Sequence, residues 1–459
     1  MKTRLGQYFA MPSLSLTIFE KLWLGIPVAV WFSFHPLIRF GQDASMYFEL
    51  SIAVIYLVVL ALSALPIIWK QRLELIKYRQ VWLVGSFVLL STLGLLWAEN
   101  TLRAVLTVGI IGLLFTVYLA SLATYNRFSK LLPSLVRIFI FSAGVMSVVA
   151  FIQFLAGIWL PRELTLLCAG CTANQLGFPR PNAFTIEPQF LASLLLAPAL
   201  ILINLVLTGR KVRWQKVFLV VIVFGLFLTL SRGAILPFGV AVLGLFILHR
   251  KYFSRIFEVI ALVLVAFLGT VLLQGFAASV NPMVDETFSG AISKTVSQLS
   301  LGKINLPSQK SINHSQIKPK PRFDGYVEES TNVRTNLAGL AVDTWLSNPW
   351  RIIFGTGVGG SGVAMNQAFP SKIDTRQITQ NQYLEILLEM GLTGLALFGA
   401  IIISLIYSLR KTKWLWLILA AYLLQWCFFS GYPNALHIYL VLIATYVYSS
   451  AQKKDFRRA

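Results

Sequence analysis

The sequence predicts an all-α polytopic membrane protein with about twelve transmembrane helices and one large extracytoplasmic loop that contains short amphipathic helices. The first observation is composition: 57% of the 459 residues are hydrophobic and only 12% are charged, against about 25% charged residues in a typical soluble domain. The second is a series of apolar runs of about 20 residues, the length that crosses a bilayer as a helix. The third is that the segments between these runs alternate between basic and nearly neutral.

The apolar runs divide the chain into three parts. Residues 1–277 hold nine predicted spans, residues 278–380 form the outer loop, and residues 381–459 hold three spans and a basic tail. The predicted spans lie at about 22–38, 50–69, 80–97, 104–123, 134–158, 189–208, 216–230, 233–248, 256–277, 381–408, 413–430 and 433–449.

Charge predicts the orientation of these spans. The net charge of +21 comes from 39 Lys and Arg against 18 Asp and Glu, and the basic residues concentrate in alternate connections such as "NRFSK", "HRKYFSR" and "RKTK". Because basic loops stay in the cytoplasm, we expect a protein of the cytoplasmic (inner) membrane with both termini cytoplasmic. A nucleic-acid partner is not expected, since the bases are scattered between apolar runs and form no basic domain.

The stretch "TLSRGAIL" (229–236) contains Arg232, the only charged residue between Val217 and Leu248. One helix over 217–248 would be roughly 48 Å long, which is too long for a hydrocarbon core of about 30 Å. We therefore expect two short helices with "SRG" at their outer turn, where Gly233 suits the tight bend. Arg232 would then lie at the outer surface, either binding an anion or snorkelling to lipid phosphate.

A second outer segment, 159–188, contains Cys168 and Cys171 and ends in "RPNAFTIEP". A CxxC pair can be a redox site or half of a zinc site, but an incidental or structural disulfide is favoured because no second CxxC exists. Arg180 and Glu187 precede a span directly. They are either ordinary anchors or a charged pair with a function.

The large loop contains a third arginine and a glycine-rich segment. "STNVRTNLAGLAVDTWLSNP" predicts an amphipathic helix on the outer leaflet, capped by Ser330 or Thr331 and ended by Asn348-Pro349. Arg334 lies near its start. The following "IIFGTGVGGSG" matches G-x-G-x-x-G only formally, because no βαβ unit surrounds it. We expect it to be a mobile loop.

The chain re-enters the membrane at "ITQNQYLEILLEMGLTG". Glu385 and Glu389 are four residues apart and share one helix face. Carboxylates are costly in lipid, so this face should point to protein or water. Gly391 and Gly394 would allow close helix packing.

Arg180, Arg232 and Arg334 are all expected on the outer face, each at the edge of an apolar element. None of the four histidines is paired with Cys, Asp or Glu at ligand spacing, so no metal site and no cofactor is predicted. The planar guanidinium group binds two oxygens at once and keeps its charge, which suits a diphosphate. At the membrane edge, the expected ligand is a lipid-borne diphosphate, with membrane lipid around it.

Three motifs in this order resemble the O-antigen ligase and O-antigen polymerase family of membrane glycosyltransferases. They are the "SRGA" turn before a large outer loop, Arg334 followed by Asn348-Pro349 and Gly355-Thr356-Gly357, and Gln380-Asn381 followed after nine residues by Gly391 and then Gly394. The resemblance covers roughly residues 170–410. It implies metal-free transfer of glycan from a polyprenyl-diphosphate-linked oligosaccharide to an acceptor hydroxyl of a glycan or glycolipid, outside the cytoplasmic membrane.

Carried over to this chain, the resemblance makes Arg180, Arg232 and Arg334 candidates for diphosphate binding. It assigns Asn381, Glu385 and Glu389 to the acceptor side or to structure. The ligase motif begins with His where this chain has Gln380, and a neutral amide cannot accept a proton near pH 7. Glu187 and Gln380 are therefore the catalytic candidates, with Glu187 as the expected base.

The missing histidine favours a repeat-unit polymerase over an O-antigen ligase that transfers to a lipid core. A transporter or lipid-linked oligosaccharide flippase is the alternative from a different class, since such proteins can also have about twelve spans. Transporters tend to show repeated halves, whereas this sequence has no convincing internal repeat and a single large loop.

Overall fold

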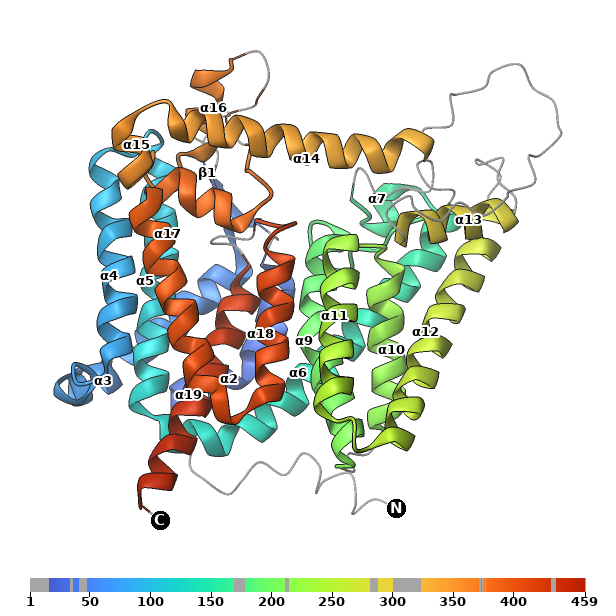
Figure 1. The fold of residues 1–459 in the computed structure, drawn as a ribbon, viewed down its shortest axis with the longest axis horizontal. Helices are drawn as coiled ribbons and strands as arrows, with labels where there is room; N and C mark the ends of the chain where they lie inside the picture. The colour runs from blue at the N-terminus through green and yellow to red at the C-terminus, as the bar shows by residue number, and fades with distance from the viewer. Residues whose placement is uncertain are drawn as a thin grey trace.

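The computed structural model describes residues 16–33, 36–40, 48–168, 178–210, 214–280, 288–299, 323–370, 373, 375, 377–430 and 435–458. Most of these residues are helical, and the long helices run side by side, with the C-terminus at one end (Figure 1). The strands within these ranges are β1 (Pro36–Phe40) and β2 (Phe48–Ser51), which form a small antiparallel sheet. The protein is thus an all-α bundle with one short hairpin.

Every predicted span overlaps a helix. Among the described residues, seven helices are long and apolar enough to cross a membrane, and four shorter apolar helices accompany them, so the chain is a polytopic membrane protein. The helices are α2 (Ile18–Ala29), α3 (Ile52–Leu75), α4 (Arg79–Leu93) with η2 (Gly94–Leu96), α5 (Thr101–Ala123), α6 (Tyr125–Trp159), α9 (Pro188–Thr208), α10 (Gln215–Leu228), α11 (Arg232–Leu248), α12 (Phe253–Val280), α17 (Gln382–Ser408), α18 (Lys413–Gln425) and α19 (Leu436–Arg458).

Two boundaries differ from the sequence prediction. The first predicted span, 22–38, is not one helix: α2 ends at Ala29, η1 (Val30–Phe32) follows, and β1 begins at Pro36. The predicted basic turn "NRFSK" is also wrong as a loop, because Asn126 to Lys130 form the first turns of the 35-residue helix α6. At 1.5 Å per residue, α6 is roughly 52 Å long and extends beyond a bilayer core of about 30 Å.

Helix α9 forms the centre of the bundle. Of its most apolar window, 89% is buried inside the protein, and it contacts α6, α10, α11, α12, α18 and α19. A helix with protein on almost every side packs apolar side chains in all directions. This burial explains why α9 is apolar on all faces. The N-terminus of α9 therefore lies among the ends of several other helices.

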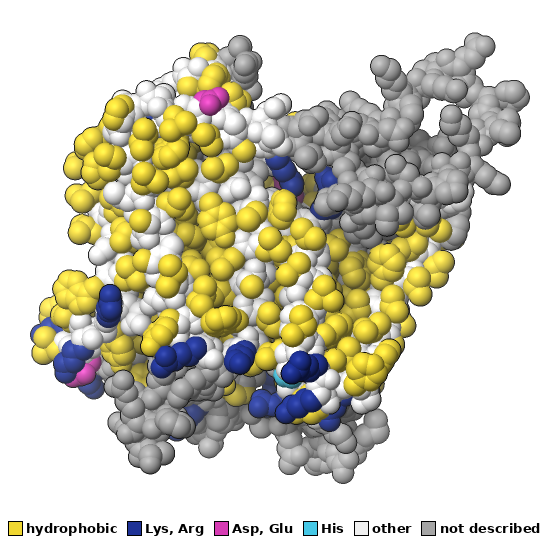
Figure 2. All heavy atoms as spheres, viewed as in Figure 1, with side chains coloured by type: hydrophobic (Ala, Val, Ile, Leu, Met, Phe, Trp, Pro, Cys, Tyr) yellow, Lys and Arg dark blue, Asp and Glu magenta, His cyan; other side chains and the backbone are white. Residues whose placement is uncertain are grey.

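Short helices cover one end of the bundle. Figure 1 shows α14 (Phe323–Leu346) lying across this end, with α7 (Arg162–Thr165) below its right-hand end and α13 (Phe288–Leu299) below and further to the right. Helices α15 (Pro349–Phe354) and α16 (Ser361–Ala368) lie at its other end. The opposite end has a row of Lys and Arg side chains below a broad hydrophobic surface (Figure 2). This asymmetry is typical of a membrane protein with one basic, cytoplasmic side.

The predicted amphipathic helix exists as α14, with two corrections. It begins at Phe323, so Ser330 and Thr331 lie inside the helix and do not cap it. Part of its apolar face packs on protein, because Leu337 and Ala341 form a small core with Met365 of α16 and Leu388 of α17, whereas Val333 and Leu346 are exposed. Asn348 and Pro349 do end the helical run, since the Asn348 side chain caps α15 by accepting from the backbone N of Trp350.

Candidate active site

A buried glutamine, Gln153, forms hydrogen bonds with the backbone of the turn that carries Arg180. Gln153 of α6 is 7% exposed, and its Oε1 accepts from the backbone N of Asn182 at 2.9 Å and of Ala183 at 2.8 Å. Ala183 has a left-handed φ of 47°, which a non-glycine residue adopts only where surrounding contacts support it. The segment "RPNAFTIEP" is therefore a defined turn.

Arg180 joins this turn to the next one along the site. Its Nε donates to the carbonyl oxygen of Thr229 at 3.0 Å. Thr229 caps the C-terminus of α10, and α11 begins three residues later at Arg232. Leu230 between them has a φ of 48°. The prediction of two short helices joined at "SRG" is confirmed, and Arg180 contacts their connection directly.

Gly233 allows the start of α11 to lie close to two other elements. A Cβ at Gly233 would stand 3.1 Å from the Cβ of Phe428, just after α18, and 3.4 Å from Nε2 of Gln189 on α9. Gln189 in turn donates from Nε2 to the carbonyl oxygen of Phe428 at 2.8 Å. The N-termini of α9 and α11 and the C-terminal end of α18 therefore meet at one point.

Arg334 reaches the same point from α14. Its Nε donates to Oε1 of Gln380 at 3.1 Å, and its Nη2 donates to Oε1 of Gln189 at 3.4 Å. Gln189 thus touches the Arg334 guanidinium with its oxygen and the Phe428 carbonyl with its nitrogen. It was missed in the sequence, where the only available signal was an amide in the first turn of a strongly apolar span.

These contacts bring four predicted residues into one neighbourhood. The links run from Arg180 to the Thr229 turn, from that turn through Arg232 and Gly233 to Gln189, and from Gln189 to Arg334 and Gln380. Figure 2 shows Lys and Arg side chains gathered in a recess near the covered end of the molecule. Two helix N-termini add partial positive charge there, which favours an anion. We call Arg180, Arg232, Arg334 and Gln189 the arginine cluster.

Glu187 lies at the rim of the arginine cluster. It occupies the N-cap position of α9, two residues before Gln189, and its side chain is exposed and makes no capping hydrogen bond. The hydrogen bond described for Arg180 goes to Thr229 and not to Glu187. A carboxylate in this position is open to solvent and to a substrate.

The remaining predicted residues differ in their surroundings. Asn381 caps α17, with Oδ1 accepting from the backbone N of Tyr383 and Leu384, while its Nδ2 donates to the Cys427 carbonyl. Glu385 and Glu389 are only 1% and 2% exposed. Both carboxylates therefore face protein, as the cost of exposing them to lipid requires.

The glycine-rich segment is not the mobile loop expected from its sequence. The backbone N of Thr356 donates to Leu388 O at 2.9 Å, and that of Gly357 donates to Glu389 O at 3.0 Å. A Cβ at Gly355 would stand 2.3 Å from the Glu389 carbonyl, and a Cβ at Gly391 would stand 2.3 Å from the Ile353 carbonyl. The two backbones interlock, and α17 departs from helical geometry at Gly391, where φ is 64°.

An ion pair between Arg351 and Glu99 links this interlocked segment to the connection between η2 and α5. Nη2 of Arg351 lies 2.6 Å from Oε1 of Glu99, in the connection between η2 and α5. Burial raises the pKa of the Glu99 carboxyl, and the nearby Arg351 guanidinium opposes part of that rise. The segment after α14 is therefore tied to both the α4–α5 connection and α17.

The cysteines are divided between two states. Cys168 is disulfide-bonded, in line with the structural disulfide favoured from the sequence, and Cys427 is a free, exposed thiol. Cys171 lies outside the described residues.

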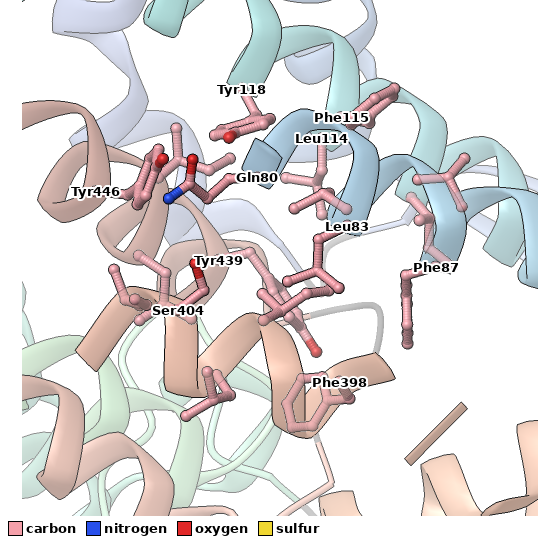
Figure 3. A pocket seen from close by; sticks show the side chains of 18 residues that line it. Gln80, Leu83, Phe87, Leu114, Phe115, Tyr118, Phe398, Ser404, Tyr439 and Tyr446 are labelled. Atoms are coloured by element: carbon pink, nitrogen blue, oxygen red, sulfur yellow. The ribbon is translucent and has the colours of Figure 1, made fainter. Parts of the chain in front are cut away.

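An apolar pocket lies elsewhere, between α4, α5, α17 and α19. Phe87, Leu114 and Phe398 line it, and Gln80, Tyr118 and Tyr446 lie together at one end (Figure 3). Because no charged side chain lines this pocket, it cannot balance the charge of an anionic headgroup. The arginine cluster is the better candidate for an active site.

Part of the chain is similar to a known protein family. Residues 217–399 match the family model described as O-antigen ligase, a range that begins in α10, ends in α17 and includes Arg232, Arg334 and Gln380. No curated protein matches the chain. This segment of the chain is therefore similar to the O-antigen ligase family, and the apolar helical bundle shows that the chain is a polytopic membrane protein.

Proposed function

We propose that this protein is a repeat-unit polymerase, which transfers glycan from a polyprenyl-diphosphate-linked oligosaccharide to an acceptor hydroxyl at the outer side of the cytoplasmic membrane. The observation that carries the proposal is the meeting of the Arg334 side chain with Gln189, beside the start of α11, where Arg232 lies. It supports a site where guanidinium groups from three separate segments surround one anion.

The arginine cluster suits a diphosphate leaving group. As the bond from the anomeric carbon to the diphosphate oxygen breaks, negative charge grows on that oxygen. Guanidinium groups stabilise this charge with bidentate, charge-assisted hydrogen bonds. The N-termini of α9 and α11 add their dipoles. In this proposal the arginines supply the counter-charge, so the transfer needs no metal ion.

The acceptor side needs a group that takes a proton. The acceptor hydroxyl oxygen forms the new bond to the anomeric carbon, its proton passes to the base, and polyprenyl diphosphate leaves. We propose Glu187 as the base, because its exposed carboxylate lies at the N-terminus of α9, two residues from Gln189. Gln380 then orients Arg334 and the acceptor through hydrogen bonds, without taking the proton.

A ligase that attaches finished glycan to a lipid core would use the same donor. The two functions differ in the acceptor, and a deletion strain separates them through its surface glycan pattern. Loss of long chains with single attached repeats retained is the result expected of a polymerase. Loss of all attached glycan would make the protein a ligase if lipid-linked glycan accumulates on the outer side, and a flippase if single lipid-linked repeats stay trapped on the cytoplasmic side.

A purified system tests the chemistry itself. The protein in lipid nanodiscs, given a lipid-linked repeat unit, should release polyprenyl diphosphate and form glycan of two or more repeats. Turnover should survive EDTA. Loss of turnover on chelation, restored by a divalent cation, would contradict the metal-independent part of the proposal.

A further inference from the structure

Glu385 is a buried carboxylate whose described hydrogen bonds lead toward the proposed site. It lies in the first turn of α17 and is 1% exposed. Its Oε1 accepts from Oγ of Ser361 at 2.6 Å. Its Oε2 accepts from the backbone N of Thr379 at 2.8 Å and from Oγ1 of Thr379 at 2.7 Å. A carboxylate buried at this depth must be hydrogen-bonded, so these contacts fix its position.

Thr379, which is held by Glu385, restricts the backbone of the next residue, Gln380. The Thr379 Oγ1 also lies 2.9 Å from the carbonyl oxygen of Asn381, so this side chain joins the residue before Gln380 to the backbone of the residue after it. Gln380 has a φ of 54°, a left-handed conformation that costs free energy for a residue with a Cβ. Such a conformation persists only where its surroundings hold it. The Glu385–Thr379 contacts provide that support.

Gln380 in turn holds Arg334. Its Oε1 accepts from the Arg334 Nε at 3.1 Å. A path of hydrogen bonds from Glu385 to Thr379, the peptide bond from Thr379 to Gln380 and a hydrogen bond from Gln380 to Arg334 therefore joins a carboxylate inside the protein to a guanidinium of the arginine cluster. No step of this path leaves the described residues.

We propose that Glu385 is a positioning residue of the transfer site: through Thr379 it fixes the left-handed Gln380, whose amide orients the Arg334 guanidinium toward the diphosphate. The inference rests on the proposed function, because it assigns Arg334 to the donor. Glu385 itself does not contact the substrate. Its role is to set the geometry of a group that lies two hydrogen-bonded steps and one peptide bond away.

The two oxygens of Glu385 provide a matched control. Ser361 on α16 bonds to Oε1 as closely as Thr379 bonds to Oε2, but the Ser361 bond does not lead to Gln380. If Glu385 merely stabilised the fold, removing either hydroxyl would have a similar effect. If Glu385 positions Gln380, only the Thr379 side should affect the arginine cluster.

The test measures the affinity of the full-length protein in nanodiscs for undecaprenyl diphosphate. Thr379→Val keeps the branched shape but removes the hydroxyl, and it should weaken binding about tenfold, the effect of one lost hydrogen bond of about 1.4 kcal/mol. Thr379→Ser returns the hydroxyl and should recover most of that loss. Ser361→Ala should stay within about twofold of the wild type, a change of less than about 0.5 kcal/mol.

A double-mutant cycle shows whether the effect passes through Gln380. Glu385→Ala should weaken binding in the wild-type background but not further in a Gln380→Ala background, because residues on one path are not additive. Additive losses, or equal losses in Thr379→Val and Ser361→Ala, would overturn the inference while leaving the proposed function intact. Equal binding by the wild type and Arg334→Ala would instead refute the role of the arginine cluster, and this inference with it.

Discussion

The Nε of Arg334 donates to Oε1 of Gln380 at 3.1 Å, although the two residues are 46 positions apart. This bond joins α14, which lies across the end of the bundle, to the segment where the chain re-enters it. Since Arg334 also reaches Gln189 on α9, one guanidinium connects the outer helices to the centre of the membrane-spanning core. The position of α14 and the geometry of the arginine cluster are therefore coupled.

The Arg232 side chain tests whether the arginine cluster recognises a diphosphate. Arg232→Lys keeps the positive charge but loses the planar fork that binds two oxygens. If a charge-assisted hydrogen bond acts in the transition state, kcat should fall about 10- to 150-fold. Turnover of a lipid-linked repeat by purified variant protein measures this change. Wild-type turnover in both Arg232→Lys and Arg232→Ala, at equal expression, would leave Arg232 as a lipid anchor.

Glu187 and Gln380 are expected to differ in the severity of their defects. Glu187→Gln keeps the shape of the side chain and removes its basicity, so saturated turnover should fall by about 10²- to 10⁴-fold. Gln380→Ala should be a partial defect, since it loses only the contact that orients Arg334. Near-normal saturated turnover in Glu187→Gln with an inactive Gln380→Ala would reverse the two roles.

The interlock between Gly355 and Gly391 should tolerate no side chain. Gly391→Ala would place a Cβ 2.3 Å from the Ile353 carbonyl at a φ of 64°, and we expect a loss of about 2 kcal/mol or more in stability. Thermal unfolding in detergent should show a lower midpoint. Gly399→Ala is the matched control in the same helix, because a Cβ there meets nothing within 4 Å. Equal midpoints for the two variants would show that the interlock is looser than described.

Single cysteines can determine which end of the bundle faces outward. In a background in which Cys427 is replaced by Ser, Asn336→Cys on the exposed side of α14 should react with an impermeant thiol reagent in intact cells, with any outer membrane permeabilised. Lys251→Cys, in the exposed turn between α11 and α12, should react only after lysis. The reverse pattern would place the basic end outside and contradict both the topology and the location of the transfer site.

Local properties of the sequence determined the bundle and the place of Arg232. Hydropathy over a window of about 20 residues reports whether a segment crosses a membrane, and a charged residue inside too long an apolar run requires a turn there. That reasoning placed the break between α10 and α11 at the correct residues. It failed at residues 22–38 and at the start of α6, because hydropathy does not encode where a helix stops within or beyond the lipid.

Only the tertiary structure decided how the site is held. Gln189 contacts Arg334 from 145 positions away, and the glycine-rich segment is fixed by backbone bonds to α17 that leave no periodic signal in the sequence. The same holds for Thr379, which appears in the sequence as an ordinary polar residue before a span. The role of Thr379 comes from Glu385, which the first turn of α17 places beside it. The buried Glu385 carboxylate gains a hydrogen bond from Thr379, and the strained backbone of Gln380 gains support from the same contact.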